Sequence, residues 1–266
     1  MFLKFNTLIL MGRNMNRKIS STTLGVISVI AFNSVALGMN AEGVHWGYEG
    51  HEGPSNWAEL SEDYALCSAG KTQSPIDISW GHSNSGSPLI TNYDSTQSEI
   101  LNNGHTIQVN LGEGNTFKTE GRLYNLLQFH FHTPSENTVD GEHYPMEMHL
   151  VHADNDGNLA VLAVMFKSGK KNQELANIWS QMPIESGASS LLNRTVDPNN
   201  LLPTDFSASL FQGSLTTPPC SEGVAWNVLR NPVEASLEQI TKFEGIVDKN
   251  ARPVQPINNR LIKHFN

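Results

Sequence analysis

The stretch "LLQFHFHTPSENTVDGEHYPMEMHLVHAD", residues 126–154, holds five of the ten histidines in the chain. Its two ends, 126–132 and 146–153, are short apolar runs bounded by turn-forming residues, which is the pattern of β-strands. The segment between them is rich in Pro, Ser, Asn, Asp and Gly, which favour turns. The sequence therefore predicts two strands, and the histidines on them are either a core pattern, a solvated face or a metal site.

The first strand separates its histidines from its aromatic residues. Side chains alternate between the two faces of a strand, so residues two apart share a face. His130 and His132 therefore lie on one face with Gln128, while Phe129 and Phe131 point the other way into apolar packing. With one side committed to the core, the histidine side is either solvated or lines a cleft.

The second strand adds a third histidine. The same parity places Glu147, His149 and Val151 on one face and turns His152 to the other. Lateral pairing of the two strands would bring His149 beside the first pair, and three imidazoles with one open position fit zinc. Gln128 and Glu147 lie where they can accept the second N–H of a metal-bound imidazole.

Two histidines of the stretch have explanations other than a metal site. We expect His152 to be a hydrogen-bonded core residue and His143 to be solvated in a loop. A buried cluster of three histidines is costly unless a metal or hydrogen bonds offset it. "HFHTPSE" also matches the H-x-H and Glu of a cupin, but the flanking glycines and a second Gly-rich motif ending in His are missing.

The rest of the chain predicts one domain dominated by a sheet, from about residue 41 to 266. Segments around 75–78, 106–111, 117–121, 159–166, 213–219 and 224–229 have strand patterns. Residues 172–182 and 236–247 have helical spacing, the second with Ser236 as N-cap. "GEGN" at 112–115 and "ADNDGN" at 153–158 predict hairpin turns.

Size and charge narrow the classes of partner. A chain of 266 residues that is 38% hydrophobic can bury one substantial core. Its net charge of −9 disfavours binding to nucleic acid or to anionic lipid. We therefore expect a small-molecule ligand and no nucleic-acid partner.

Residues 1–38 have the order of a secretory signal, with Arg17 and Lys18 before an apolar run at 24–32 and the small residues of "NSVALG" after it. Translation from Met15 would give a signal of ordinary length. The run is too short for a spanning helix, although an uncleaved anchor is the alternative. Cleavage would leave a domain at 39–266 without a membrane span, and the loss of four bases would lower its net charge to about −13.

Taken together, these motifs resemble those of the α-class carbonic anhydrases, in the form found in bacterial exported members. The matching motifs follow the family's order over nearly all of the mature chain: "WGYEG" at 46–50, "QSPIDI" at 73–78, "NNGH" at 102–105, "QFHFHTPSEN" at 128–137, "MEMHLVH" at 146–152, "GSLTTPPC" at 213–220 and "ARPVQPINNR" at 251–260. The resemblance implies a twisted, mainly antiparallel central sheet with peripheral helices, mostly β in class.

The resemblance implies reversible hydration of CO2 to bicarbonate and a proton, with one Zn²⁺ per chain. Zinc-bound hydroxide attacks CO2, and this family is itself the source of the value of about 7 for the pKa of the zinc-bound water. Glu136 would accept a hydrogen bond from the Thr216 hydroxyl, whose oxygen then accepts from the hydroxide, and His105 would shuttle protons. The implied zinc ligands are His130, His132 and His149, held by Gln128, the Asn250 carbonyl and Glu147.

Further positions follow from the same resemblance. Thr217 would contact bicarbonate, and an apolar wall would receive CO2. Gln108 stands where the animal enzymes commonly have Asn. The wall positions are Val151, Val161, Leu215, Val224 and Trp226, and the positions that order water are Tyr48, Asn103 and Gln108.

Cys67 and Cys220 are the only two cysteines. In an exported chain an even number suggests a bridge, and two separate buried thiols are the alternative. The resemblance implies that they form a disulfide, that the protein is periplasmic or secreted, that it forms a homodimer, and that sulfonamides inhibit it. Two other functions remain open at this point: a non-catalytic binding protein on the same fold, and a zinc esterase.

Overall fold

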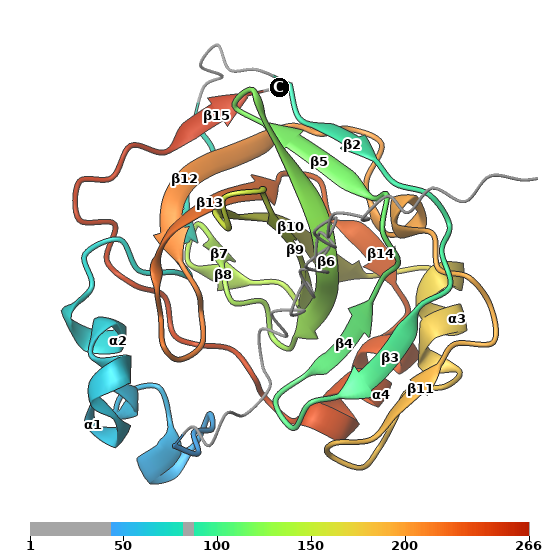
Figure 1. Ribbon diagram of the computed structural model, residues 1–266, viewed down its shortest axis with the longest axis horizontal. Helices are drawn as coiled ribbons and strands as arrows, with labels where there is room; N and C mark the ends of the chain where they lie inside the picture. The colour runs from blue at the N-terminus through green and yellow to red at the C-terminus, as the bar shows by residue number, and fades with distance from the viewer. Residues whose placement is uncertain (1–43, 82–87, 266) are drawn as a thin grey trace, which may run out of the picture. The chain divides into compact units, whose positions relative to one another are not determined.

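The two histidine-bearing runs form neighbouring strands at the middle of a large sheet. The structure is a computed structural model that describes residues 44–81 and 88–265. In it, β6 (Arg122–His132) and β9 (Met146–Ala153) pair antiparallel (Figure 1). The predicted signal region 1–38 and its boundary lie outside the described residues.

Among the described residues, twelve strands make up one sheet, whose main path is β11-β3-β4-β6-β9-β10-β13-β12-β15. Most pairs are antiparallel, and β10 pairs in parallel with β13 and β14. β1, β7 and β8 form a separate small sheet. The predicted mostly-β, mainly antiparallel class is confirmed. The remaining bounds are β1 Asp77–Ile78, β2 Ile90–Asn92, β3 Glu99–Asn102, β4 Ile107–Asn110, β5 Thr116–Thr119, β7 Thr138–Val139, β8 Glu142–His143, β10 Leu159–Ser168, β11 Ser189–Leu191, β12 Ala208–Ser214, β13 Glu222–Leu229, β14 Val233–Ala235 and β15 Lys263–Phe265.

The helices are short, and both predicted ones are present. The capping box of α4 pairs the Ser236 side chain with the backbone of Gln239 and the Gln239 side chain with the backbone of Ser236, which confirms the predicted N-cap. Gln239 also accepts from the backbone N–H of Asn172, the N-cap of α3, so the two helix starts are joined. The bounds are α1 Trp57–Leu60, α2 Leu66–Ala69, α3 Gln173–Trp179 and α4 Leu237–Val247, with 3-10 turns at Gly50–Glu52, Glu62–Tyr64 and Pro198–Leu201.

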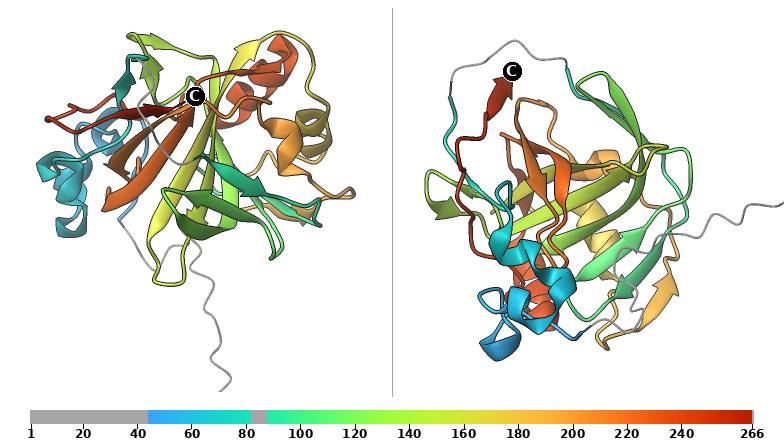
Figure 2. Two further views of the ribbon diagram at one scale, coloured as in Figure 1. Left: turned by 90° about the horizontal axis from the view of Figure 1, so that it is seen from above. Right: turned by 60° about the vertical axis from the view of Figure 1, so that its left-hand side comes forward.

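The main core lies on the face of the sheet opposite the histidines. Phe129 and Phe131 are fully buried in it, as their parity predicts. The Phe131 ring lies 4.8 Å from Trp179 of α3 and 5.9 Å from Phe243 of α4, measured between ring centroids. α3 and α4 therefore cover this face, as Figures 1 and 2 show, and leave the other face of β6 and β9 to the histidines.

One of the two predicted hairpins is wrong. "GEGN" joins β4 to β5, but these strands do not pair with each other; each pairs with a different part of β6. The true hairpin lies between β5 and β6, where Glu120 and Gly121 both have positive φ, as a type I′ turn requires. The second prediction is confirmed, because Ala153 pairs with Leu159 across the turn.

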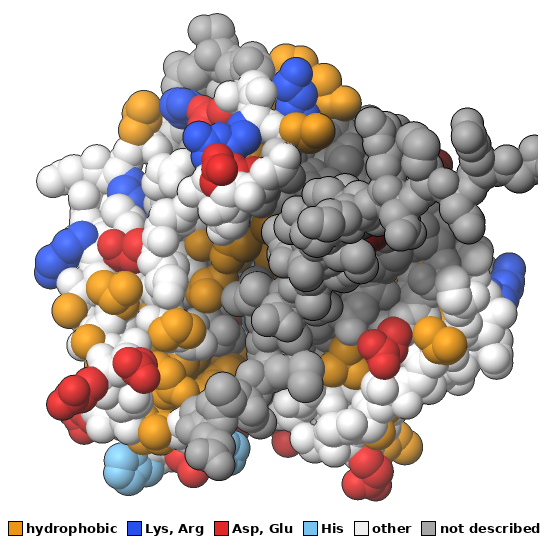
Figure 3. Space-filling model, in the orientation of Figure 1, with side chains coloured by type: hydrophobic (Ala, Val, Ile, Leu, Met, Phe, Trp, Pro, Cys, Tyr) orange, Lys and Arg blue, Asp and Glu red, His pale blue; other side chains and the backbone are white. Residues whose placement is uncertain are grey.

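The surface bears on the expected partners. On the face shown in Figure 3, the Lys and Arg side chains lie in the upper half, and the lower half shows acidic side chains and His without Lys or Arg. A broad basic field, which would attract a polyanion, is not seen on the described part of this face. No helix of the described residues is long and apolar enough to cross a membrane.

Candidate metal centre

The register of β6 and β9 brings the three predicted histidines together. His130 and His149 are directly paired, and His132 lies two residues further along β6 on the same face. One ring nitrogen from each imidazole lies within 4.8 Å of the others. His132 and His149 are buried, whereas His130 is partly exposed, so solvent reaches the group from the His130 side.

Two of the imidazoles are held by residues of their own strands. Nδ1 of His130 lies 2.9 Å from Oε1 of Gln128, and Nε2 of His149 lies 3.1 Å from Oε1 of Glu147. The Gln128 oxygen only accepts, so Nδ1 of His130 carries its proton. Nε2 of His149 faces the Glu147 carboxylate without a regular hydrogen bond, and that negative charge favours a proton on Nε2. The opposite nitrogens, Nε2 of His130 and Nδ1 of His149, therefore offer lone pairs to a metal.

His132 is held from the far end of the chain. Its Nδ1 donates to the backbone oxygen of Asn250 over 2.8 Å. The Asn250 side chain accepts from the N–H of Thr133 and donates to the carbonyl of Phe131, so its own position is fixed by β6. The other nitrogen, Nε2 of His132, is buried and has no hydrogen-bond partner among the described residues.

The electrostatics of the group fit zinc. Burial lowers the pKa of all three histidines, and for His130 and His149 the neighbouring imidazoles lower the pKa further. Neutral imidazoles are the form that ligates metal. Three nitrogen donors with one position left open match a catalytic zinc site rather than a closed structural one.

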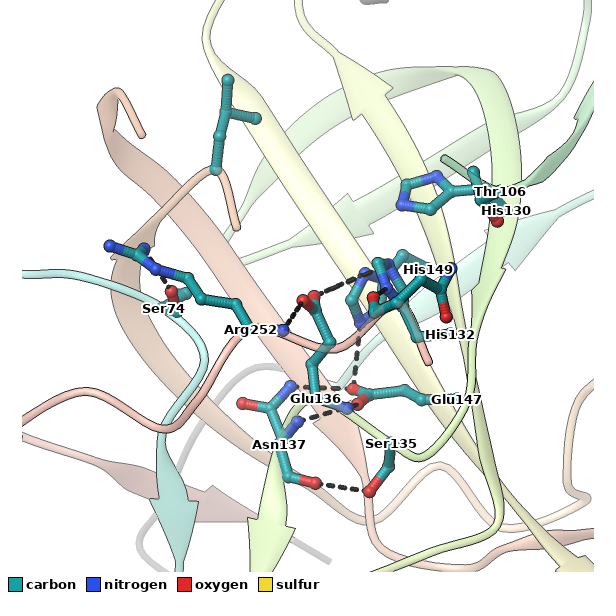
Figure 4. A network of polar contacts seen from close by, with 12 residues as sticks. Ser74, Thr106, His130, His132, Ser135, Glu136, Asn137, Glu147, His149 and Arg252 are labelled. Atoms are coloured by element: carbon teal, nitrogen blue, oxygen red, sulfur yellow. Dashed lines mark hydrogen bonds and ion pairs between the residues drawn. The ribbon is translucent and has the colours of Figure 1, made fainter. Parts of the chain in front are cut away.

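Glu147 is the polar anchor beneath the histidines (Figure 4). It is fully buried, which raises the pKa of its carboxyl, and its hydrogen bonds oppose that rise. Oε2 accepts the backbone N–H groups of Glu136 and Asn137 over 2.7 and 2.9 Å, and Oε1 accepts the Asn137 amide over 2.7 Å. These three hydrogen bonds hold the carboxyl group in place behind His149.

Glu136 is the second buried carboxylate of the site. Oε1 accepts the backbone N–H of Arg252 over 2.9 Å, while Oε2 lies 3.5 Å from Nε2 of His132 and 3.9 Å from Nδ1 of His149. Burial raises the pKa of Glu136 to about 8, and Thr216 and the Arg252 N–H oppose that rise. The Thr216 contact falls short of a regular hydrogen bond to Oε2.

Thr216 lies in a short loop between β12 and β13, and Cys220 of this loop forms a disulfide with Cys67. Leu215 donates from its backbone to Ser221 over 2.9 Å, and Cys220 to Thr217 over 2.8 Å. Cys220 is bonded to Cys67, so the disulfide expected from the cysteine count is present and fastens this loop to α2. Thr216 is buried and Thr217 is partly exposed.

The expected apolar wall forms a row across neighbouring strands. Val151 of β9 pairs with Val161 of β10, which pairs with Trp226 of β13. This row lies beside the row that holds His149, and the Trp226 ring stands perpendicular to the His149 ring at 4.9 Å between centroids. Val224 is buried two residues before Trp226 on the same face, and the half-buried Leu215 follows β12.

Tyr48, Asn103 and Gln108 come from three segments on the side of His130. Gln108 of β4 pairs with His130, and its Oε1 lies 3.4 Å from Nδ2 of Asn103. Burial raises the pKa of Tyr48, and the nearby charge of Glu136 raises it further, which places Tyr48 near that carboxylate. The structure thus brings these three residues around the histidines.

His105 is held differently from the expectation of a near-neutral proton carrier. Its ring is stacked on Trp46, with 3.7 Å between centroids and 6° between planes. Burial, and then the charge of His45, lower the pKa of His105 to about 4. Oδ1 of Asn103 accepts the His105 N–H in a tight turn, so the backbone here is fixed as well.

The two remaining histidines of the central stretch stand apart from the trio. His152 is buried on the core face, where Nε2 meets the hydroxyl of Tyr93 at 2.7 Å and Nδ1 meets the carbonyl of Ala160 at 3.3 Å. His143 is exposed as expected, although it lies in the short strand β8 rather than in a loop.

Arg252, Gln73 and Trp46 are site neighbours that residue-by-residue reasoning on the sequence did not single out. Arg252 is almost fully buried, although it stands in a segment whose prolines suggest an exposed loop. An arginine just after Asn250 is a weak signal, because nothing local shows that the segment runs underneath the histidines. Trp46 and Gln73 lie in recognised motifs, but only the fold shows which side chains they touch.

Known proteins share this arrangement. A family model described as eukaryotic-type carbonic anhydrase matches residues 52–266. A carbonic anhydrase of Pectobacterium carotovorum is 45% identical over 242 residues, which span 90% of this chain and 99% of the relative. One of Neisseria gonorrhoeae is 44% identical over 243 residues, spanning 91% and 95%.

Solved structures share the fold of this chain as well as its sequence motifs. The α-carbonic anhydrase of Thermovibrio ammonificans, solved with the inhibitor sulfanilamide, superposes with a TM-score of 0.81 at 47% identity. The superposition covers 83% of this chain and 99% of that one. With the family model, these relatives and the three-histidine group in agreement, the chain belongs to the eukaryotic-type, or α-class, carbonic anhydrases, zinc enzymes that interconvert CO2 and bicarbonate.

Proposed function

We propose that CO2 is hydrated at the three histidines and that Thr216, Glu136 and the apolar row are the working parts around them. One observation carries the proposal: one ligand nitrogen of each imidazole lies within 4.8 Å of the other two, while the second nitrogen is hydrogen-bonded in His130 and His132 and faces the Glu147 carboxylate in His149. His130, His132 and His149 would hold the zinc. Bound zinc supplies a Lewis acid that makes hydroxide available at neutral pH.

Thr216 and Glu136 would orient the nucleophile. Glu136 is fixed at Oε1 by the Arg252 N–H, and a cation on the histidines favours its ionised, acceptor-only form. Thr216 has a single hydroxyl proton, so directing that proton at Glu136 leaves Oγ1 as an acceptor. The nucleophile then has one orientation in which its own hydrogen points to Thr216, and its lone pair is free to face the substrate.

The row of Val151, Val161 and Trp226 would receive CO2, which is apolar and needs few hydrogen bonds. These side chains are nearly fully buried beside His149, so they exclude water next to the reacting atoms. Val224 and Leu215 extend the same surface. Thr217, partly exposed at the loop, would contact the charged product.

The proton released by the reaction would leave the site on the side of His130. Tyr48, Asn103 and Gln108 supply polar atoms on which water chains can form. His105 would pass the proton to buffer when it leaves the stack with Trp46, because in the stacked position its pKa of about 4 makes it a poor base.

We also propose that the protein acts after export, in the periplasm or outside the cell, and as a homodimer. Export is supported by the signal-like order of residues 1–38 and by the disulfide between Cys67 and Cys220, which persists in an oxidising compartment. The homodimer rests on the resemblance to exported bacterial members of the family. Fractionation of cells into cytoplasm and periplasm, followed by size-exclusion chromatography with light scattering, tests both statements.

The activity is tested on protein that begins at residue 39. Stopped-flow CO2 hydration is recorded against a pH indicator, and zinc per chain is measured on the same sample. We expect about one zinc per chain and loss of both zinc and activity in His149→Ala, with the exposed His143→Ala as matched control. Full zinc without hydration would contradict the mechanism and direct attention to ester hydrolysis or to non-catalytic binding.

A further inference from the structure

Arg252 is the largest charged side chain buried near the site, and its guanidinium makes three hydrogen bonds. It is 1% exposed. Nη1 donates to Oε1 of Gln73 over 2.9 Å and to the carbonyl of Ser74 over 2.7 Å, and Nη2 donates to the carbonyl of Cys67 over 2.8 Å. The guanidinium also lies over the Trp57 ring, 5.6 Å from its centroid. A buried cation needs such partners, but burial alone does not explain why this one stands here.

The backbone of the same residue reaches the site. The Arg252 N–H donates to Oε1 of Glu136 over 2.9 Å, and the other oxygen of that carboxylate faces His132 and His149. Since the side chain of Arg252 is fixed at three carbonyl-type oxygens, its backbone N–H has little freedom to turn. The orientation of Glu136 is therefore set through the guanidinium.

A second connection runs from Arg252 to the loop of Thr216. Gln73 accepts from Arg252 with Oε1, and with Nε2 it donates to the carbonyl of Cys220 over 2.9 Å. Cys220 closes the loop that begins at Leu215 and holds Thr216. Arg252 thus contacts Glu136 directly, and through the Gln73 amide it is connected to Cys220, at the end of the loop that holds Thr216.

The disulfide and the arginine brace the same two pieces of backbone. Cys67 and Cys220 are bonded through sulfur, and their carbonyl oxygens accept from Arg252 and from Gln73, respectively. The arginine also packs on Trp57, whose ring touches Trp46 and Tyr48 edge-on at 5.4 and 5.9 Å. The Arg252 side chain therefore lies where three groups of residues meet: the disulfide, Gln73 with the loop of Thr216, and the aromatic cluster around Trp57.

We propose that Arg252 is a positioning residue of the active site, which holds Glu136 and the Thr216 loop in their working relation through its guanidinium, its backbone N–H and Gln73. This inference rests on the proposed roles of Glu136 and Thr216. It makes Arg252 more than a stabilising group, because its replacement changes the geometry around the nucleophile even in folded, zinc-loaded protein.

The test uses Arg252→Lys, which keeps the charge but loses the planar fork that serves three acceptors at once. Arg260→Lys is the matched control, because Arg260 also donates to the carbonyl of Gln73, and to that of Gln212, from the same C-terminal segment. Arg260 makes no hydrogen bond to Glu136. Zinc content, melting temperature, kcat, KM and the dissociation constant of sulfanilamide are measured for both variants and for the unsubstituted protein.

We expect Arg252→Lys to lower kcat by between about tenfold and 100-fold, with little change in KM. The dissociation constant of sulfanilamide should rise as well. Both changes should be seen with zinc fully bound and at temperatures well below the melting temperature. Arg260→Lys should lower the melting temperature only. In zinc-free protein, amide NMR signals of Glu136 and Thr216 should shift in Arg252→Lys and stay in place in Arg260→Lys.

The outcomes separate the inference from the proposed function. If Arg252→Lys and Arg260→Lys lose stability alike and keep kcat, sulfanilamide affinity and amide shifts, Arg252 is structural and the inference fails. If the unsubstituted, zinc-loaded protein does not hydrate CO2, the proposed function fails, and the NMR comparison still judges Arg252. Should Arg252→Lys not fold, Gln73→Leu is the second variant: it leaves Arg252 in place but removes one acceptor of its guanidinium and the side-chain donor to Cys220 and Glu222. An unchanged kcat there would equally overturn the proposal.

Discussion

The imidazole of His105 lies flat against the indole of Trp46, 3.7 Å away and within 6° of parallel. This stack covers one face of the half-buried His105 ring, and burial is the main reason why its pKa falls to about 4. A group with that pKa is neutral at pH 7 but accepts a proton poorly. The aromatic neighbour therefore controls how useful His105 is as a base.

Replacement of Trp46 by Ala should return the pKa of His105 toward the ordinary value of about 6.5. The imidazole would regain its hydration, which favours the charged form. Proton NMR titration of the His105 ring measures this directly. His45→Ala is the comparison, since the charge of His45 is the smaller cause and its removal should raise the pKa less. An unchanged pKa in Trp46→Ala would show that the stack does not desolvate His105.

Glu147→Ala should weaken zinc binding by about 10- to 100-fold. The carboxylate fixes the His149 ring and also accepts the backbone of Glu136 and Asn137, so its loss frees the ligand to rotate. Competition with a zinc-binding dye gives the dissociation constant. Glu142→Ala, an exposed carboxylate in nearby β8, is the control and should bind zinc normally. Equal affinities in the two variants would contradict the role given to Glu147.

Enlarging Val161 should block the substrate more than it unfolds the protein. Val161 faces the histidines from β10, while Val164 on the opposite face of the same strand is packed in the core. Val161→Phe should lower kcat/KM steeply with a small loss of melting temperature. Val164→Phe should cost about 1–3 kcal/mol of stability by overpacking, with near-normal kcat/KM per folded molecule. The reverse pattern would remove Val161 from the substrate wall.

Reduction of the disulfide should destabilise the fold and reduce activity together. Cys67 and Cys220 are 153 residues apart, so the chain-entropy model gives a stabilisation of about 5 kcal/mol. Denaturant unfolding with and without dithiothreitol measures this difference. Activity should fall as well, because Cys220 closes the loop of Thr216. Unchanged stability and activity under full reduction, verified by thiol titration, would disprove both effects.

Acid should destabilise the protein through His152. Burial lowers the pKa of His152 to about 3, whereas the unfolded chain titrates near 6.5. Between these values the unfolded state binds a proton that the folded state does not, so stability is complete above pH 6.5 and falls as the pH is lowered toward 3. The free energy of unfolding, measured with urea at several pH values, should fall less steeply with decreasing pH in His152→Gln than in the unsubstituted protein. An equally steep fall in both proteins would show that other groups cause the acid sensitivity.

The histidine site was predictable because parity and pairing are local rules. Because residues two apart in a strand share a face, His130 and His132 could be placed together. The predicted pairing of β6 with β9 then brought His149 beside them. Gln128 and Glu147 followed from the same spacing. The class of fold and both main helices were likewise readable from apolar patterning and capping residues.

The alternation of side chains along a strand could not predict the contacts that distant segments make with the site. Asn250 and Arg252 meet His132 and Glu136 across more than a hundred residues, and no local pattern encodes such contacts. The turn at 112–115 was mistaken for a hairpin because turn chemistry does not show which strand the chain will pair with next. The pKa of His105 depends on Trp46, which lies far from it in sequence.

The contacts from the C-terminal segment bear on the order in which the protein is made. The ribosome synthesises the three histidines well before Asn250 and Arg252, and domains fold only once their chain is available. Until that last segment has emerged, His132 lacks its acceptor and Glu136 lacks its donor. A nascent or prematurely terminated chain without these two residues therefore carries every metal ligand and still has no finished site.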